Sequence, residues 1–363
     1  SGDELDFSAE VELSDSTKNS PQVSKFKYCL FKKDILSLSV ALSNALSKKP
    51  DKREYEVTAG EYALVRKQGR AWALKDVVRF YGFPDEVVAY YQNADFVQDL
   101  NLAHEKLFNS IFYLGPLRTK AERLYTWGGI TPESVGFSGE NTIAAILAAR
   151  GRRISLGYKQ RAKSLEEIIA LKLKGMGLIE DFEVEPISKQ RQEYEVKVCT
   201  KGSKDWVDLP DVGFGISQVL PVLVQCFYAP PGSTIIMEQP EIHLHPSAQS
   251  ALADVMIDVI NSREKGTHRN IQLIIETHSE HFLRRLQRGI AEDKVPQEKV
   301  SAYFANIGKI PSTLDSLQID ILGNILNWPE NFFGDEMGDI IGQAEAAMKK
   351  RTQPGAKKLE ISE

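Results

Sequence analysis

The sequence is poor in cysteine and contains no long apolar run. It has 3 cysteines among 363 residues, Cys29, Cys199 and Cys226, and no two of them form a CxxC pair. This spacing provides neither a disulfide framework nor a thiolate metal site, and it is typical of the reducing cytosol. The best candidate for a membrane span, residues 219–227, is too short to cross a bilayer. We therefore expect a cytoplasmic protein without a membrane segment.

The chain also lacks an excess of positive charge. With 45 basic and 50 acidic residues its net charge is −5, which argues against a uniformly basic coat for nucleic acid but leaves room for a local basic patch. The small cluster of Arg284, Arg285 and Arg288 is expected to be a solvated helix face. The apolar fraction of 42% is close to the globular average, and the length allows two or three domains.

The N-terminal third is predicted to be rich in β-structure and then helical. Apolar residues alternate over residues 7–13, 28–35 and 55–65, as in half-buried antiparallel strands. Pro84 opens a helical stretch that Gly115 and Pro116 end. Further along, helices are expected near residue 140 and over 164–175, and strands over 182–199. The Lys-rich tail after Ala347 is expected to be disordered.

The most regular part of the sequence lies between residues 234 and 287. A short apolar strand at 234–237 is followed by a helix that starts at Pro246, a second strand at 271–275 and a second helix. This order predicts a right-handed parallel crossover and an α/β core. In such sheets ligands bind beyond the carboxyl ends of the strands.

Polar residues follow both predicted strands. Glu238, Gln239 and Glu241 come after the first strand, and Glu276, Thr277 and His278 after the second. Carboxylate oxygens suit Mg²⁺, and a histidine can donate a hydrogen bond to a terminal phosphate oxygen. A single acid at a strand tip often only solvates a loop, but the two tips together favour a phosphate site.

Another candidate precedes the long apolar helix at 219–227. Gly213 and Gly215 allow close backbone approach, and Ser217 with Gln218 stands at the helix start, where anions bind. Taken in isolation, this string is better explained as an ordinary glycine-containing helix cap.

The order of these three motifs resembles the second half of an ABC-class ATPase of the RecF, SMC and OLD-nuclease type. There they are the signature motif, the Walker B strand with its D-loop, and the switch histidine. The resemblance extends over about residues 110–340 and is specific over 211–279. Three further stretches are similar to bacterial predicted AAA/ABC-type ATPases with a C-terminal domain of unknown function: Tyr-Leu-Gly-Pro-Leu-Arg at 113–118, Gly-Phe-Ser-Gly-Glu-Asn at 136–141 and Asn-Trp-Pro-Glu-Asn-Phe-Phe at 327–333.

The resemblance implies that ATP and Mg²⁺ are the cofactors. Glu238 takes the Walker B position, where it holds Mg²⁺ through a water, and His278 is the switch histidine. The signature residues would contact the γ-phosphate bound to the opposite copy of a homodimer. The residues implied to bind nucleotide are Gly213, Gly215, Ser217, Gln218, His245 and Thr277.

The residue that activates water stays open. Gln239 stands where these ATPases usually carry a catalytic glutamate, and an amide cannot act as a general base. Gln239 would then position water, as a glutamine does in small GTPases; otherwise Glu241 is the base, or hydrolysis is slow. Arg118 is either a phosphate contact or a surface residue. We set aside a zinc site at His243 and His245, because no third ligand accompanies them.

The chain lacks the phosphate-binding loop of such ATPases. Its only Gly-Lys pair, Gly308 and Lys309, has Tyr303 in place of the first glycine and Ile310 in place of Ser or Thr. Alone, the chain is therefore expected to bind ATP weakly. Either the loop lies in a segment outside this sequence, or the chain is a degenerate relative.

The predicted fold is thus an ABC-type P-loop NTPase core with an N-terminal β-rich lobe and a helical insert. The leading function is an ATPase that works as a nucleotide-sandwiched dimer and drives a DNA-related or defence-type partner, an effector or a nuclease. The alternatives are a pseudoATPase scaffold and, last, an OLD-type ATPase-nuclease. The expected boundaries are 1–115 for the first lobe, 116–210 for the insert, 211–300 for the core, 301–345 for a small domain and 346–363 for the tail.

Overall fold

The structure is a computed structural model, and it divides the chain into two units, Ser1–Ser110 and Ile111–Glu363. The described residues are 4–13, 21–32, 35–45, 54–58, 64–69, 79–188, 191–200, 202, 205–306, 311–329, 332 and 336–352. Parts of four sequence predictions lie outside them: the second half of the strand at 55–65, the Gly308-Lys309 pair, most of the 330–333 stretch, and the tail beyond Thr352.

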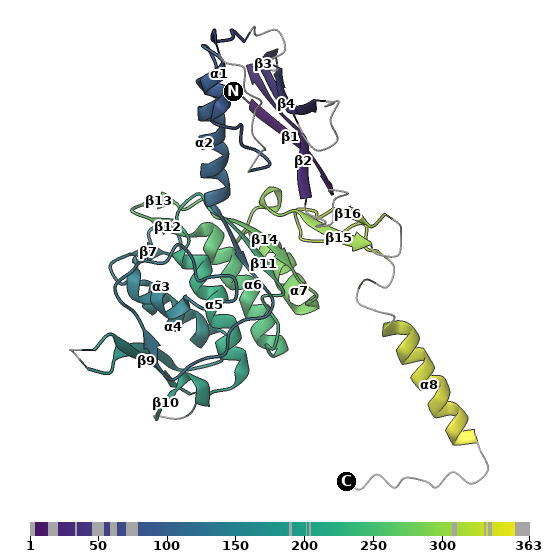
Figure 1. Cartoon of the computed structure of the whole chain (residues 1–363). Coiled ribbons are helices and arrows are strands. Elements are labelled where there is room, and N and C mark those ends of the chain that lie inside the picture. Colours follow the sequence, from purple (N-terminus) through teal and green to yellow (C-terminus); the bar gives the residue numbers. More distant parts are fainter. Residues whose placement is uncertain are drawn as a thin grey trace. The chain divides into compact units, whose positions relative to one another are not determined.

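The first unit contains the expected antiparallel sheet followed by helices (Figure 1). Its strands pair in the order in which they occur: β1 (Glu4–Leu13), β2 (Pro21–Lys32), β3 (Ile35–Ala45) and β4 (Glu54–Thr58). The helices are α1 (Glu86–Tyr90) and α2 (Phe96–Asn109). Alternate residues of β2 and β3, such as Phe26, Tyr28 and Leu42, form a core of their own with Phe83 and Val87.

The second unit is built around a parallel sheet of three strands in the order β14-β11-β5. The strands are β5 (Ile111–Leu114), β11 (Thr234–Glu238) and β14 (Gln272–Glu276). Ile235 and Met237 point into the core, so Ile236 and Glu238 lie on the opposite face. The predicted strand–helix–strand–helix crossover is confirmed, with α6 (Pro246–Asn261) and α7 (Glu280–Ala291) as its helices.

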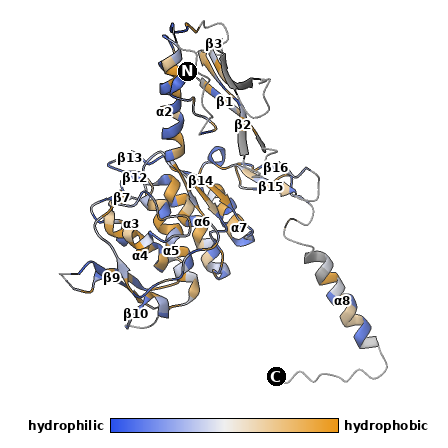
Figure 2. Ribbon diagram, viewed as in Figure 1, coloured by the Kyte–Doolittle hydropathy of each residue, from blue (hydrophilic) through white to orange (hydrophobic). Residues whose placement is uncertain are grey.

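The helix α5 (Phe214–Tyr228) forms the centre of this core. Of its 15 residues, 12 are buried, which explains why its sequence is apolar on every side. It contacts β11, and α6 contacts β14, so both helices cover one face of the sheet (Figure 1). Figure 2 shows apolar residues concentrated on these two helices. Pro221 inside α5 packs against Gly139.

The rest of the second unit surrounds this core. Its helices are α3 (Thr142–Ala148), α4 (Leu165–Gly175) and α8 (Glu336–Thr352). Its short sheets contain β6 (Tyr125–Thr126), β8 (Asp181–Pro186), β9 (Glu193–Cys199) and β10 (Trp206–Asp208); β7 (Ile154–Ser155), β12 (Arg263–Glu264) and β13 (Thr267–His268); and β15 (Ala302–Asn306) with β16 (Thr313–Leu317). Among the described residues, no helix is both long and apolar enough to span a membrane.

Two predictions about segments have clear outcomes. The helix expected at 164–175 and the strands expected over 182–199 are α4, β8 and β9. The expectation of disorder after Ala347 is wrong for its first part, because α8 continues to Thr352. Alanine, lysine and arginine favour a helix there. The richness in lysine alone did not distinguish a solvated helix from a disordered tail.

Candidate functional site

The carboxyl ends of β11 and β14 place two acids side by side. Glu238 and Glu276 are direct partners in the parallel register, and both project from the same face of the sheet. His278 follows, with its Nε2 3.7 Å from a Glu276 oxygen and its side chain 76% exposed. Glu238, Glu276 and His278 therefore come from the same edge of the sheet. Glu276 was expected among the polar residues at this strand tip but was given no role of its own, although it directly ends the apolar run of β14.

Tyr113 of β5 holds the Glu238 carboxylate. The tyrosine hydroxyl donates to Oε1 at 2.7 Å, because β5 pairs with the other edge of β11. The same hydrogen bond raises the pKa of Tyr113. It leaves the second oxygen of Glu238 free of any hydrogen bond within the described residues. In the sequence, Tyr113 was noted only as part of the stretch 113–118, which resembles the ATPase family.

Arg118 lies beneath the loop that follows β11 rather than on the surface. The residue is 6% exposed, and its guanidinium donates from Nη2 to the carbonyl oxygens of Glu238 at 3.1 Å and Gln239 at 3.5 Å. Burial lowers the pKa of Arg118 to about 10. The surface interpretation of Arg118 is therefore wrong: the side chain braces the backbone at the tip of β11. Its Nε and Nη1 are buried without a partner among the described residues.

The loop after β11 turns sharply at two residues. Gln239 and His243 have φ values of +43° and +64°, in the left-handed region that non-glycine residues rarely adopt. The amide of Gln239 donates to the Glu276 carbonyl at 2.8 Å, so the turn is fixed to the neighbouring strand. Such strain persists only where the surroundings impose it, and it concentrates at functional sites.

Glu241 joins the two strand tips. Its side chain is buried, and its Oε1 accepts from Thr277 Oγ1 at 2.7 Å and from the His278 amide at 2.9 Å. The other oxygen is buried without a hydrogen-bond partner within the described part of the chain. Glu241 and Thr277 thus position the backbone that carries His278.

His245 and Gln249 order the segment that leads into α6. His245 is the N-cap residue, and its Nδ1 accepts from the Ser247 amide at 3.3 Å. The side chain of Gln249 donates to the Leu244 carbonyl at 3.0 Å and accepts from Ser279 Oγ at 2.6 Å. These contacts leave the His245 ring exposed while they tie this segment to the start of α7.

The start of α5 lies against the same loop. Gly213 is the exposed N-cap, and Ser217 Oγ donates to the Phe214 carbonyl at 2.8 Å. A Cβ on Gly215 would lie 3.0 Å from the His243 carbonyl oxygen, so a side chain at this position would push the loop away from the helix start. The side chain of Gln218 is 2% exposed and packs inward. The expectation that Gln218 contacts nucleotide is therefore wrong.

The two loops whose sequences resemble those of the ATPase family, after β5 and around residues 136–141, lie together beside β5. The Gly115 amide donates to the Phe137 carbonyl and the Thr119 amide to the Ser138 carbonyl, each at 2.9 Å. The Phe137 ring is 5.0 Å from that of Tyr113. Gly139, with φ +84°, packs so closely on Pro221 of α5 that an added Cβ would lie 2.6 Å from it.

Taken together, the site presents two carboxylates and an exposed imidazole at one edge of the sheet. Carboxylate oxygens are the ligands that Mg²⁺ prefers, usually completed by water and phosphate. Within the described residues no group of three or more His, Cys, Asp or Glu side chains could hold a metal ion by itself. The donor set therefore fits a metal that arrives with a phosphate ligand, and not a closed all-protein metal site.

Two family matches cover most of the second unit. Residues 135–284 match the family described as "AAA domain, putative AbiEii toxin, Type IV TA system", and residues 295–341 match "Protein of unknown function (DUF3696)". Residues 135–284 are therefore similar to an AAA-type domain and residues 295–341 to a domain of unknown function, in the order that the sequence resemblance implied. No curated protein matches the sequence.

Among solved structures, heads of SMC ATPases are similar at low identity. One, from work on ATP-driven dimerisation and DNA-stimulated activation of SMC ATPases, is 11% identical with a TM-score of 0.31, over 53% of this chain and 93% of that one. A SMC head bound to the C-terminal winged-helix domain of ScpA is 11% identical with a TM-score of 0.35, over 84% and 77%. The SMC head of Thermotoga maritima is 9% identical with a TM-score of 0.32, over 84% and 78%.

Proposed function

We propose that two copies of this protein bind ATP and Mg²⁺ between them, and that closure of this sandwich drives a partner in a DNA-related or defence-type step. The description of the matching AAA family as a putative toxin of a toxin–antitoxin system supports the defence role. The three free cysteines of this chain suit a cytoplasmic protein.

The observation that carries this proposal is the shared edge of β11 and β14. Glu238 and Glu276 stand next to each other, and His278 reaches out from the same edge with most of its ring exposed. A single exposed acid at a strand tip is common, but two carboxylates and an imidazole at the same edge of a sheet fit a triphosphate with its metal.

Each residue then has a role that matches its contacts. Glu238, held by Tyr113, would help to hold Mg²⁺, and His278 would donate a hydrogen bond to the γ-phosphate. Ser217 and the amides at the start of α5 contact the nucleotide of the other copy, since this helix start is accessible. Glu241 and Arg118 keep the two strand tips in place, and Mg²⁺ supplies the neutralisation of phosphate charge.

Two features allow the missing phosphate-binding loop to be supplied by another segment. Within the described residues β14 pairs with β11 only, so its other edge offers free backbone groups. On the face that carries Glu238 and Glu276, Ile274 is 49% exposed, although parallel sheets are usually covered on both faces. A further strand and helix that carry the phosphate-binding loop would cover both the free edge of β14 and the exposed face of the sheet.

A second function is favoured by Gln239, which occupies the position of the usual catalytic base. The chain would then hold ATP as a clamp or scaffold without turnover. Gln239→Glu distinguishes the two functions in an ATP-hydrolysis assay. A measurable wild-type rate that this variant changes supports the ATPase, whereas no turnover in either protein supports the scaffold.

The sandwich itself is tested by light scattering of the full gene product with and without Mg–ATP. We expect ATP to convert monomer to dimer in the wild type, and Ser217→Arg and His278→Ala to abolish this conversion. Ser188→Arg, on an exposed turn away from the site, is the matched control and should dimerise normally. Equal association of all four proteins, with or without ATP, would remove the sandwich.

A further inference from the structure

A strongly basic segment lies outside the ATP site. Residues 150–163 contain six Lys and Arg residues and no Asp or Glu, in a chain whose net charge is −5. They are Arg150, Arg152, Arg153, Lys159, Arg161 and Lys163. The segment runs from the end of α3 through β7 to the start of α4.

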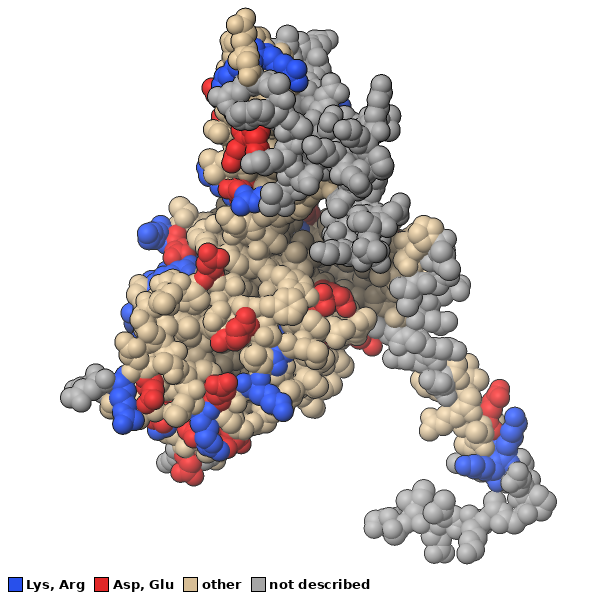
Figure 3. All heavy atoms as spheres, in the orientation of Figure 1, with Lys and Arg blue, Asp and Glu red and all other residues tan. Residues whose placement is uncertain are grey.

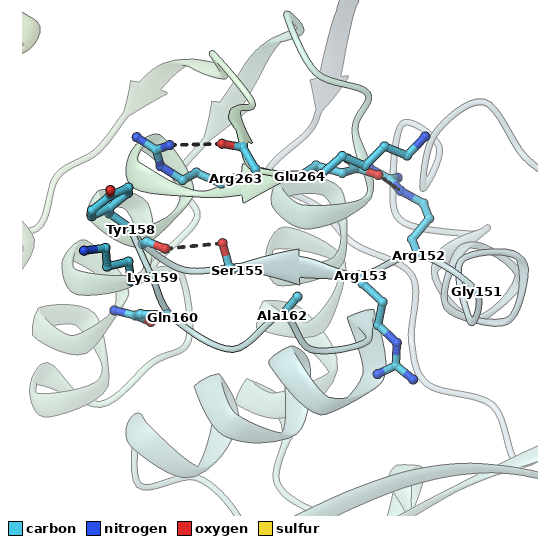
Figure 4. Close-up of a pocket in the computed structure, with 13 residues that line it drawn as sticks. Gly151, Arg152, Arg153, Ser155, Tyr158, Lys159, Gln160, Ala162, Arg263 and Glu264 are labelled. Carbon is cyan, nitrogen blue, oxygen red and sulfur yellow. Dashed lines mark hydrogen bonds and ion pairs between the residues drawn. The ribbon is translucent and has the colours of Figure 1, made fainter.

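The fold adds a second basic segment to the first. β7 pairs with β12, which places Arg263 opposite Ser155, and β12 turns back into β13 through Lys265 and Gly266. Between the two segments lies a pocket of about 740 Å³, lined by residues 151–153, 155, 157–160, 162 and 263–266. Figure 4 shows the Tyr158, Lys159 and Arg263 side chains gathered at one end of this pocket.

Part of this positive charge is neutralised within the protein, and part is not. Arg152 pairs with Glu264 at 2.8 Å, and Arg153 pairs with Glu167 at 3.0 Å. In the described part of the chain, no carboxylate pairs with Lys159, Arg263 or Lys265. On the face shown in Figure 3, the surface around β9 and β10 carries acidic and basic side chains interspersed.

An exposed aromatic ring lies among the unneutralised charges. Tyr158 is 70% exposed, and its ring centroid is 5.1 Å from the Lys159 ammonium and 5.2 Å from the Arg263 guanidinium. Lys159 and Lys265 both have φ in the left-handed region, so tight turns display their side chains. Cations beside an exposed ring are the combination that holds a phosphodiester chain and a base.

We propose that this pocket binds single-stranded nucleic acid, with phosphates on Lys159, Arg263 and Lys265 and an unpaired base against Tyr158. A pocket of this volume admits an unpaired nucleotide, whereas a stacked duplex presents a convex backbone that would meet only its rim. An acidic protein segment would use the cations but would gain nothing from the tyrosine ring.

This inference names the substrate class of the proposed ATPase, but the binding itself requires neither ATP nor dimerisation. It is measured by fluorescence anisotropy of a labelled oligothymidylate of about 15 nucleotides, enough to cover one such site. A duplex of the same length and polyglutamate serve as competitors, and ATP-dependent dimerisation is recorded in parallel.

The key variant is Lys159→Glu with Lys265→Glu. We expect it to weaken binding at least tenfold and to reduce the slope of log affinity against log salt by about 1.4, for two lost phosphate contacts. The matched control, Lys174→Glu with Arg191→Glu, changes the net charge equally on exposed residues elsewhere and should bind as the wild type does. Tyr158→Ala should weaken binding about tenfold, and Tyr158→Phe should not.

Several outcomes would overturn the proposal: no binding by the wild type, equal loss in the key and control variants, or polyglutamate competing as well as oligothymidylate. A duplex that outcompetes the single strand would also reject it. Binding by the Ser217→Arg variant shows that the pocket is independent of the sandwich. If that variant binds while no protein dimerises with ATP, the proposed function fails and this inference stands.

Discussion

At the residue scale, single polar contacts set the geometry of the candidate site. Glu238 keeps one oxygen on Tyr113, and Glu241 fixes the backbone of His278 through Oε1. Glu238 ends β11 and Glu241 follows it, yet the fold gives the two acids opposite environments: Glu238 faces the open side of the sheet, whereas Glu241 is buried. The side with free carboxylate oxygens is the side where a metal-bound phosphate can approach.

Tyr113→Phe should weaken the response to Mg²⁺ without affecting the fold. The variant removes one hydrogen bond to a charged group, which contributes about 1.5 kcal/mol or more, so the Mg²⁺ concentration for half-maximal ATP-dependent dimerisation should rise about tenfold. Tyr125→Phe is the control, since its hydroxyl accepts from the Glu122 amide and, among the described residues, has no hydrogen bond to the site. An unchanged Mg²⁺ response in Tyr113→Phe would contradict the role of this hydrogen bond.

Arg269→Met should destabilise the second unit strongly. The Arg269 side chain is fully buried and donates to the carbonyl oxygens of Cys226, Phe227 and Ala229 at the end of α5, and its burial lowers its pKa to about 10. Removing it leaves buried carbonyls without donors, for a loss of about 3 kcal/mol in the free energy of unfolding. Urea unfolding measures this, with the exposed Arg288→Met expected to change stability by less than about 0.5 kcal/mol.

At the element scale, α5 links the site to the core. Its first turn touches the loop after β11 through Gly215, its middle packs on Gly139 through Pro221, and its last turn is capped by Arg269. A change at any of these three points would tilt the helix whose start carries Ser217. The site therefore depends on contacts made along the whole helix.

Gly139→Ala tests the middle contact, with Gly232→Ala as a matched control. Both glycines have φ near +80°, at +84° and +82°, but an added Cβ lies 2.6 Å from Pro221 at Gly139 and meets nothing within 4 Å at Gly232. Both variants bear the backbone cost of about 1 kcal/mol. Only Gly139→Ala should add a packing cost of about 2 kcal/mol in urea unfolding. Equal losses of stability in the two variants would show that Pro221 can move away from the added Cβ at no cost in free energy.

At the scale of the whole molecule, the proposed sandwich places Glu238 of one copy and Ser217 of the other at the same nucleotide. A mixture of Glu238→Gln and Ser217→Arg copies can therefore form a dimer with one intact site and one doubly defective site. We expect the mixture to recover ATP-dependent dimerisation that neither variant shows alone, as measured by light scattering. Continued absence of dimer in the mixture would place both residues on a nucleotide within one copy.

The sequence by itself determined the α/β core, its strand–helix–strand–helix order and the family it resembles. Apolar periodicity and turn residues are local, so β11, α6, β14 and α7 could be placed from the chain alone. The same holds for Glu238 and His278, since residues that directly follow parallel strands must share one edge of the sheet.

Only the tertiary structure decided which polar residues face a ligand and which brace the site. Arg118, Gln218 and Glu241 are polar residues of kinds that sequence places on the surface, and the fold buries all three. The pairing of β7 with β12 likewise joins two basic segments about 100 residues apart into one pocket. Burial and such encounters depend on contacts between residues distant in the chain, and neither periodicity nor motif spacing encodes them.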